Sequence, residues 1–247
     1  MAMVFGVISG VYYGIMTRES VFVAGIFYSA YYLFDISDGQ LARLKKNGTR
    51  LGRIIDGISD YVTHLAVYIG LGIGFTENSN DPLMSWLLIL SALSSMLIHA
   101  VLLDYYRNRY MAYASGSSDL YGDDLKAFRE EYVELKKNRG NYVSRSIYWL
   151  YFKYLSFQKL FSSAEKSDNI LNKFDKDNFL ERNRLPIRLW TLMGTATHVT
   201  LLIISSFLYR LDVYLWGIIT VLNIYAIVMV VMQFFVDKGT KIKKINQ

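Results

Sequence analysis

Four aspartates lie at the edges of two apolar segments, and their spacing could support metal-dependent chemistry. Asp35 and Asp38 are three positions apart, and Asp56 and Asp60 are four apart. Either spacing places both side chains of a pair on one face of a helix. Facing carboxylates repel one another unless cations lie between them, and hard oxygen ligands favour Mg²⁺ or Mn²⁺. The alternative is a set of solvated carboxylates paired with nearby Lys and Arg.

The residues between the two pairs could accommodate a phosphate-containing substrate. Gly39, Ala42 and Gly52 are small and leave room beside the carboxylates, and Arg43 carries a permanent charge that can hold a phosphate. Metal ligands, an arginine and a steric opening at a membrane surface together indicate phosphoryl transfer on a lipid.

The composition indicates a membrane protein. Of the 247 residues, 53% are hydrophobic although 19% are charged, so charged and apolar residues occupy separate stretches. The absence of cysteine excludes a disulfide scaffold and a thiolate zinc site. The net charge of +6 could suit nucleic acid or an anionic membrane surface, and the apolar stretches favour the membrane, so we expect no nucleic-acid partner.

Six stretches approach the length of a helix that crosses a bilayer, which needs about 20 apolar residues. We therefore expect an all-α, polytopic membrane protein with six transmembrane helices. The expected spans are Met1–Met16, Val21–Phe34, Ile54–Phe75, Leu83–Leu103, Trp190–Leu208 and Val213–Val236.

The basic residues predict the orientation of these spans. Of the 27 Lys and Arg, all but Arg18 and Arg210 fall in the Ala42–Arg53 connection, in the segment after the fourth span or in the C-terminal tail. Positively charged residues mark the cytoplasmic side of a membrane protein. We expect both termini and the aspartates to face the cytoplasm.

Composition divides the chain into three parts. Residues 1–113 hold four spans and the aspartates, residues 114–189 form a cytoplasmic and interfacial insertion, and residues 190–247 hold two spans and a basic tail. Ser146–Phe161 is rich in Tyr, Trp and Lys, which predicts an interfacial helix, with a core helix of a soluble domain as the alternative. We interpret Asn169–Arg188 as a polar linker.

The aspartates and the small residues between them resemble the signature of the CDP-alcohol phosphatidyltransferase family. All eight fixed positions of that signature occur here at its spacings, within about a tenth of the chain. They are Asp35, Asp38, Gly39, Ala42, Arg43, Gly52, Asp56 and Asp60. The expected topology, with six spans and a cytoplasmic motif, also resembles this family.

The resemblance implies a reaction in phospholipid biosynthesis: the hydroxyl group of an acceptor alcohol displaces CMP from a CDP-alcohol donor at two metal ions. Asp35, Asp38 and Asp56 would be metal ligands. Asp60 would touch a metal and act as the catalytic base that activates the acceptor hydroxyl. Family members are commonly homodimers, which favours a homodimer here.

The resemblance also implies how the donor binds. Gly39, Ala42 and Gly52 would border the cytidine and diphosphate, and Arg43 would contact the phosphates. We expect CDP-diacylglycerol as the donor and a polar alcohol as the acceptor, with CDP-choline or CDP-ethanolamine transfer to diacylglycerol as the alternative. The sequence lacks the Gly-Arg-Glu segment that glycerophosphate-using members often carry, which argues against that acceptor.

Two departures from the family pattern concern the N-terminus and the acceptor. Only 34 residues precede Asp35, fewer than is usual, as expected of a sequence that starts at an internal Met. The Asp104–Leu189 segment is longer than the usual connection, and residues near it often help to choose the acceptor. Arg107 and Arg109 are candidate acceptor-binding residues, with snorkelling to lipid headgroups as the alternative.

Two other protein classes remain as alternatives. An intramembrane prenyltransferase also uses facing Asp-rich helices and Mg²⁺, but its two motifs usually lie far apart in the chain. A divalent-cation transporter would need carboxylates near the bilayer midplane and a repeated half. The sequence favours the phosphotransferase over both.

Glycine and histidine residues in the spans give further expectations. Gly6, Gly10 and Gly14 recur every four residues and form a smooth ridge, which we interpret as packing within the chain rather than a dimer contact. His64 lies one turn after Asp60 and could tune it, although an intramembrane histidine with satisfied hydrogen bonds is the simpler interpretation. The two remaining histidines, at positions 99 and 198, are interpreted as lone residues without a chemical role.

Overall fold

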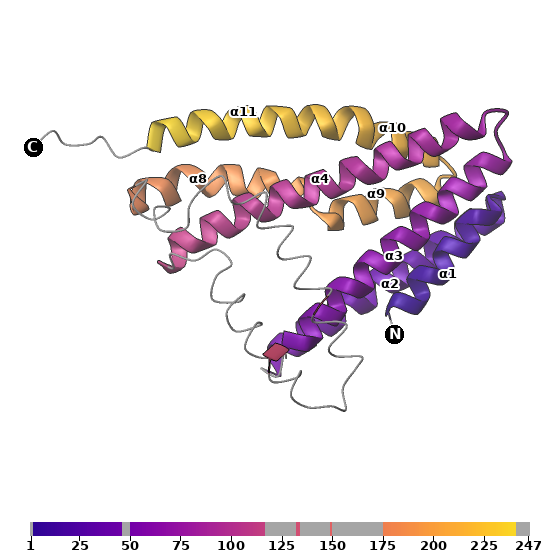
Figure 1. Cartoon of the computed structure of the whole chain (residues 1–247), viewed down its shortest axis with the longest axis horizontal. Helices are drawn as coiled ribbons and strands as arrows, with labels where there is room; N and C mark the ends of the chain where they lie inside the picture. The colour runs from indigo at the N-terminus through magenta and orange to yellow at the C-terminus, as the bar shows by residue number, and fades with distance from the viewer. Residues whose placement is uncertain (1, 46–49, 117–131, 134–148, 150–174, 241–247) are drawn as a thin grey trace, which may run out of the picture. The chain divides into compact units, whose positions relative to one another are not determined.

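Helices account for almost all of the chain that the structure describes (Figure 1). This computed structural model describes residues 2–45, 50–116, 132–133, 149 and 175–240. The long helices are α1 (Ala2–Ile15), α2 (Arg18–Leu44), α3 (Arg50–Glu77), α4 (Pro82–Ser115), α8 (Lys176–Trp190), α9 (Thr195–Phe207) and α11 (Asn223–Thr240). Three short helices complete the set: η2 (Thr191–Met193), α10 (Leu211–Gly217) and the π-helical η3 (Ile218–Leu222). The described residues contain no strand, which agrees with the expected all-α class.

Four helical segments are long and apolar enough to cross a membrane. They are Arg18–Leu41, Ile55–Glu77, Pro82–Ser115 and Leu211–Thr240. A bent pair, α8 with α9, adds a fifth if it counts as one span. The expected first span corresponds to α1, which has 14 residues and is shorter than a bilayer requires. Six spans are therefore not confirmed, and the expected interfacial helix, Ser146–Phe161, lies outside the described residues apart from Trp149.

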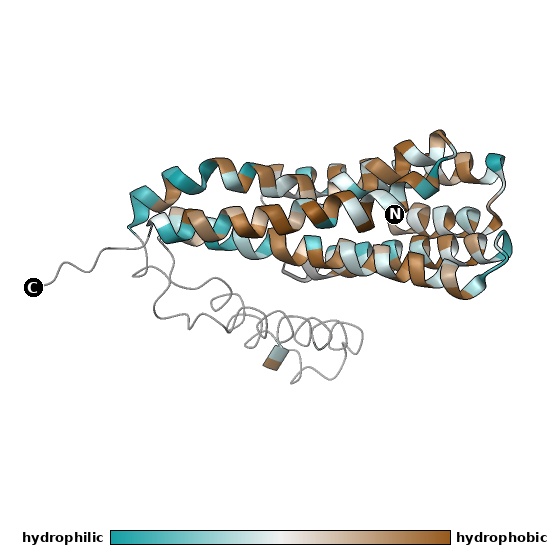
Figure 2. Ribbon diagram, turned by 90° about the horizontal axis from the view of Figure 1, so that it is seen from above, coloured by the Kyte–Doolittle hydropathy of each residue, from teal (hydrophilic) through white to brown (hydrophobic). Residues whose placement is uncertain are grey.

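The helix surfaces fit a lipid environment. Large apolar side chains are well exposed on them, including Leu33 (65%), Val221 (65%) and Phe234 (64%). Apolar residues run along the helices, while hydrophilic ones gather at turns and helix ends (Figure 2). Exposed apolar surface of this extent is unfavourable in water and favourable in hydrocarbon. The chain is therefore a helical membrane protein.

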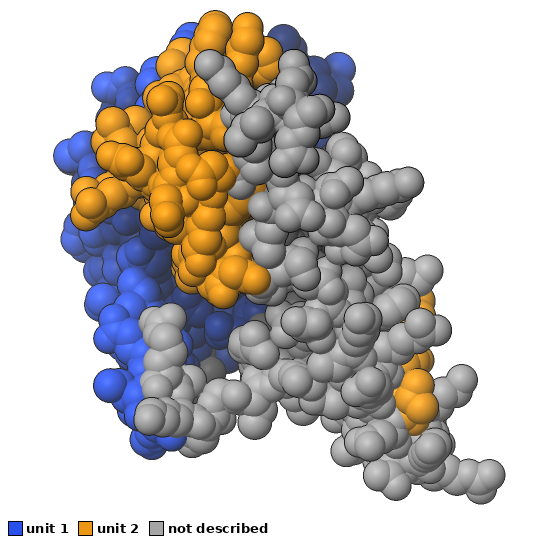
Figure 3. All heavy atoms as spheres, turned by 90° about the vertical axis from the view of Figure 1, so that its left-hand side faces the viewer, with its two compact units in different colours: residues 1–100, 193–225 blue, residues 101–192, 226–247 orange. Residues whose placement is uncertain are grey.

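The contacts divide the chain into two compact units (Figure 3). The first unit contains residues 1–100 and 193–225, and the second contains residues 101–192 and 226–247. The boundaries fall within α4, η2 and α11. All four aspartates belong to the first unit.

In the first unit, α1 packs against both α2 and α3. The glycine ridge makes this approach close, because a Cβ atom at Gly10 would lie 2.5 Å from the carbonyl oxygen of Ala66 in α3. Gly70 in turn lies against the backbone of Gly10. The expected packing role of the ridge within the chain is confirmed.

In the second unit, α8 contributes a buried face to a small aromatic core. Phe179, Asn183, Pro186 and Trp190 are buried at spacings of four, three and four residues, which is the periodicity of one helix face. The Phe179 ring stacks on Tyr113 with a centroid distance of 4.1 Å. The interpretation of Asn169–Arg188 as a polar linker is wrong from Lys176 onward, because these few buried residues outweigh the surrounding polar ones.

We predict that Gly10→Ala destabilises the protein, since the new methyl group would collide with the backbone of Ala66. Overpacking of this kind costs about 1–3 kcal/mol, more than the ~1 kcal/mol that alanine gains over glycine in a helix. The matched control is Gly14→Ala on the same ridge, where the nearest atom to a Cβ lies at 3.8 Å. Thermal unfolding in detergent should show a lower Tm for Gly10→Ala alone; equal Tm values for both variants would contradict the close approach.

Candidate active site

The structure brings the four aspartates together at the end of α2 and the start of α3. Asp35 and Asp60 are half-buried, while Asp38 and Asp56 are exposed. The carboxyl groups of Asp35 and Asp60 approach within hydrogen-bonding range, and Asp38 interacts electrostatically with Asp56. Because α2 and α3 run in opposite directions, the inner member of each pair meets the inner member of the other. The site therefore has an inner and an outer pair of carboxylates.

None of the four carboxylates forms an ion pair with a Lys or Arg among the described residues. Asp35 interacts electrostatically with each of the other three. Like charges this close repel, and the repulsion is strongest where burial removes water. A cation between the helices would offset it.

The donor set fits a hard divalent cation, although the ligands are not gathered around one point. Carboxylate oxygens are the ligands that Mg²⁺ and Mn²⁺ prefer. In the described part of the chain, no group of three or more Asp, Glu or His side chains is spaced to hold one ion. The chemistry of the residues therefore agrees with a metal site, and the structure gives no coordination geometry for it.

Open space adjoins the carboxylates. A Cβ atom added at Gly39, beside Asp38, or at Gly57, beside Asp56, would meet no described atom within 4 Å. Ala42 and Arg43 lie in the last turn of α2 and Gly52 lies in the first turn of α3, but the side chains of Ala42 and Arg43 are outside the described part. That Gly39, Ala42, Arg43 and Gly52 contact a substrate stays a prediction.

A tyrosine that we did not expect holds Asp60. The Tyr31 hydroxyl donates a hydrogen bond of 2.8 Å to Oδ1 of Asp60. The spacing in the sequence could have indicated this tyrosine, since Tyr31 precedes Asp35 by four residues and so lies on the same face of the helix. His64 does not form a hydrogen bond with Asp60; its Nδ1 lies 3.0 Å from the Tyr28 hydroxyl, and its Nε2 is buried without a partner among the described residues.

The two candidate acceptor arginines lie in the second unit and differ in their surroundings. Arg107 is exposed. Arg109 is only 5% exposed and forms an ion pair with Asp237, and its guanidinium lies over the Phe179 ring at 5.2 Å. Asp237 also accepts a hydrogen bond from Gln233. Arg109 is buried and its charge is already paired with Asp237. The exposed Arg107 is therefore the better placed of the two for binding a solute.

His99 and His198 are not lone residues, which corrects the expectation from the sequence. His99 Nδ1 lies 3.3 Å from His198 Nε2, and His99 Nε2 lies 2.9 Å from Oδ1 of Asn223. The Asn223 amide donates to Oγ of Ser95 at 3.0 Å. An amide oxygen only accepts, so the neutral His99 carries its proton on Nε2 and accepts from His198 through Nδ1. These partners are about 100 residues apart in the sequence, and no local pattern reveals them.

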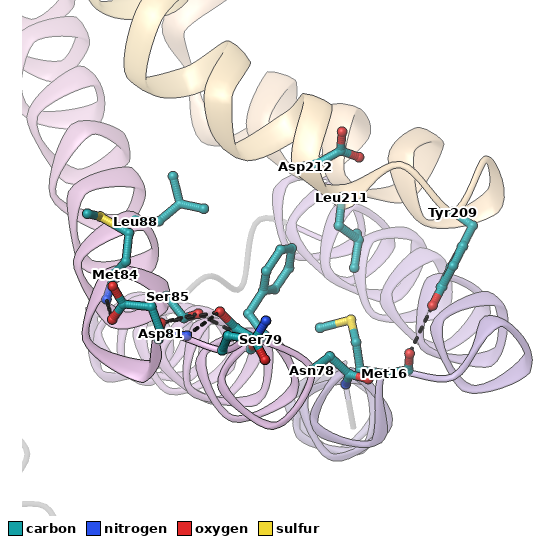
Figure 4. A pocket seen from close by; sticks show the side chains of 12 residues that line it. Met16, Asn78, Ser79, Asp81, Met84, Ser85, Leu88, Tyr209, Leu211 and Asp212 are labelled. Atoms are coloured by element: carbon teal, nitrogen blue, oxygen red, sulfur yellow. Dashed lines mark hydrogen bonds between the residues drawn. The ribbon is translucent and has the colours of Figure 1, made fainter.

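A pocket of the first unit lies away from the aspartates (Figure 4). It has a volume of about 690 Å³ and is lined by three short turns, around Met16, Ser79 and Tyr209. The Tyr209 hydroxyl donates to the carbonyl oxygen of Met16 at 3.1 Å. These turns follow α1, α3 and α9, so the carboxylates are at the other ends of α2 and α3.

The fold and the site define a helical membrane protein with a cluster of facing carboxylates at the ends of two helices. The family model described as CDP-alcohol phosphatidyltransferase matches residues 1–123, and through this region, which holds all four aspartates, the chain belongs to that family. Membership implies phosphotransfer from a CDP-alcohol in phospholipid synthesis, in a family that generally depends on divalent metals. No curated protein and no solved structure matched the chain.

We predict that Asn223→Ala lowers the free energy of unfolding by about 1–2 kcal/mol, because it leaves the buried His99 without an acceptor. The matched control is Ser95→Ala, after which the Asn223 amide still donates to the carbonyl oxygen of Ile219. Thermal unfolding in detergent should separate the two variants. Equally small Tm shifts for Asn223→Ala and Ser95→Ala would contradict the hydrogen bond between His99 and Asn223.

Proposed function

We propose that the chain transfers a substituted phosphate group from a CDP-alcohol to a second alcohol and releases CMP. The observation that carries this proposal is the meeting of four carboxylates that have no basic partner among the described residues, beside open space at two glycines. We further propose CDP-diacylglycerol as the donor and a polar alcohol as the acceptor. The membrane setting supports a lipid substrate, since α2 and α3, which carry the aspartates, are long and apolar enough to cross a bilayer.

Asp35, Asp38, Asp56 and Asp60 would hold Mg²⁺ or Mn²⁺, with two ions expected. Bound metal would neutralise charge on the diphosphate and orient the attack. The carboxylates themselves repel the anionic donor when the site is free of cations.

Asp60 is proposed as the base. It accepts the proton of the acceptor hydroxyl, whose oxygen forms a bond to the phosphorus that carries the donor's alcohol. The bond from that phosphorus to the CMP oxygen breaks, and CMP leaves with the electron pair. Asp60 suits this role because it is half-buried and one oxygen is already fixed by Tyr31.

The small residues and the arginine would receive the donor. Gly39, Ala42 and Gly52 would border the cytidine and diphosphate, and Arg43 would contact the phosphates. For the acceptor, Arg107 is proposed in preference to Arg109. The cytoplasmic orientation of the site and a homodimer are part of the same proposal; the orientation rests on the distribution of basic residues.

The test is CMP release by the purified protein in detergent with Mn²⁺ or Mg²⁺. CDP-diacylglycerol would be crossed with glycerol 3-phosphate, inositol phosphate, serine and inositol, and CDP-choline and CDP-ethanolamine with diacylglycerol. Metal-dependent release with CDP-diacylglycerol and one polar acceptor supports the full proposal. Release only with diacylglycerol as acceptor would assign the alternative donor, and no release with any pair would contradict the proposal.

We predict that Asp60→Asn abolishes turnover, because the amide cannot accept the proton, while CDP-alcohol binding stays detectable through the remaining carboxylates. Loss of a general base typically costs about 10²–10⁴-fold in rate. The measurements are CMP release and binding of the CDP-alcohol to the same preparation. Full activity in this variant would remove Asp60 from the proposed role.

We also predict that Gly39→Ala weakens donor binding without harming the fold. Its methyl group would meet none of the described atoms, so stability should hold or rise by up to ~1 kcal/mol from helix propensity. The matched control is Gly217→Ala in α10, where a Cβ likewise meets no described atom within 4 Å. We expect the KM for the CDP-alcohol to rise by about tenfold in Gly39→Ala only, because small misplacements of a substrate are costly. An unchanged KM would mean that the donor does not lie against Gly39.

A further inference from the structure

Tyr31 is a buried polar side chain at the proposed active site, and the signature does not include it. It is 3% exposed and lies on α2, yet its hydroxyl reaches across to Asp60 on α3. We propose that Tyr31 is a positioning residue that aims the Asp60 carboxylate at the acceptor hydroxyl. This inference rests on the proposed function, because it assigns a role to a partner of the proposed base.

The hydrogen bond fixes Asp60 without consuming it. A carboxylate has two oxygens and about four lone-pair sites, and Tyr31 occupies one of them on Oδ1. Asp60 also lies within hydrogen-bonding range of Asp35, so a proton or a cation shared with Asp35 would occupy another of these sites. A phenolic O–H donor to an ionised carboxylate is also stronger than a neutral hydrogen bond, so it selects one orientation of the side chain.

The Tyr31 ring is itself held in place by rings from both helices. Tyr28, one turn earlier on α2, stacks on it with a centroid distance of 5.5 Å and an interplanar angle of 17°. His64 on α3 meets it edge-on, at 6.2 Å and 88°. Tyr28 and His64 are joined by their own hydrogen bond of 3.0 Å. The Tyr31 hydroxyl is therefore a preorganised donor, since the ring cannot turn away without breaking these contacts.

Asp60 alone among the four aspartates is held in this way within the described part of the chain. No hydroxyl or basic side chain there donates to Asp35, Asp38 or Asp56. The difference matches the proposed roles, because Asp60 is the one aspartate proposed as the base as well as a metal ligand, and a base must point at one hydroxyl group. Geometric precision at the reacting group is where misplacement has the largest effect on rate.

The first test is Tyr31→Phe, which keeps the ring and its contacts and removes only the hydroxyl. We expect kcat to fall on the order of tenfold, as the loss of a hydrogen bond to a charged group suggests. The KM for the CDP-alcohol should stay within about twofold, because Tyr31 is only 3% exposed and its hydroxyl is bonded to Asp60. A purely structural role would instead change activity only in step with stability.

The matched control is Tyr68→Phe. Tyr68 is equally buried, at 2% exposed, and lies two turns further along α3 than Asp60, but its hydroxyl pairs with the neutral Tyr214 hydroxyl at 2.9 Å. We expect this variant to lose stability and to retain the wild-type kcat. If Tyr31→Phe and Tyr68→Phe have the same kcat as the wild type, Tyr31 does not position the base.

The second test measures the Tyr31–Asp60 coupling without any turnover. A double-mutant cycle of Tyr31→Phe and Asp60→Ala, followed by thermal unfolding in detergent, should be non-additive, because each change removes the same hydrogen bond. The parallel cycle of Tyr68→Phe and Asp60→Ala should be additive. Additivity in both cycles would overturn the inference even in an inactive preparation. If the wild type releases no CMP with any substrate pair but the cycle shows the coupling, the proposed function is contradicted, while the hydrogen bond between Tyr31 and Asp60 is supported.

Discussion

The close approach of α1 to α3 is the contact on which the site depends. At Gly10 and Gly70 the two backbones touch without intervening side chains, and α1 also packs along α2. Helices α2 and α3 carry the aspartates, and they meet each other through side-chain pairs such as Tyr28 with His64 and Tyr31 with Asp60. Four like charges would drive α2 and α3 apart, so a third helix that contacts both supplies the opposing packing energy. The short α1 thus has a structural role although it does not have the length of a membrane span.

Polar groups inside the first unit are arranged in separate pairs. Tyr13 bonds to Ser206, Tyr68 bonds to Tyr214, and His99 bonds to both His198 and Asn223. In hydrocarbon an unpaired polar group is costly, so each pair ties one helix to another. Such bonds fix how each of the bonded helices is rotated about its own axis. Apolar packing alone fixes this rotation less firmly, because lipid tails compete for the same contacts.

Short-range patterns in the sequence predicted the parts of the structure that depend on spacing within one or two helices. The aspartate pairs and the glycine ridge both follow from helical periodicity. The sequence could not reveal the His99–His198 pair, since its members meet only through the tertiary fold. Tyr31 was overlooked for another reason: in an aromatic-rich span, one tyrosine hydroxyl is indistinguishable from its neighbours until the facing helix is in place. Hydropathy alone does not confirm six spans, because an apolar stretch as short as α1 can belong to the protein interior as well as to a membrane crossing.

The π-helical turn of η3 determines where the last span can lose a residue. It directly precedes Asn223, whose side chain bonds to His99. A π-turn contains about one more residue than an α-turn, whereas each residue of a regular helix rotates it by about 100°. Deleting one residue within η3 would therefore restore a regular helix and keep Asn223 facing His99. The same deletion in α10, after Tyr214, would turn Asn223 by about 100° relative to Tyr214, which bonds to Tyr68. Changes of length in this span are therefore best accommodated at the π-turn.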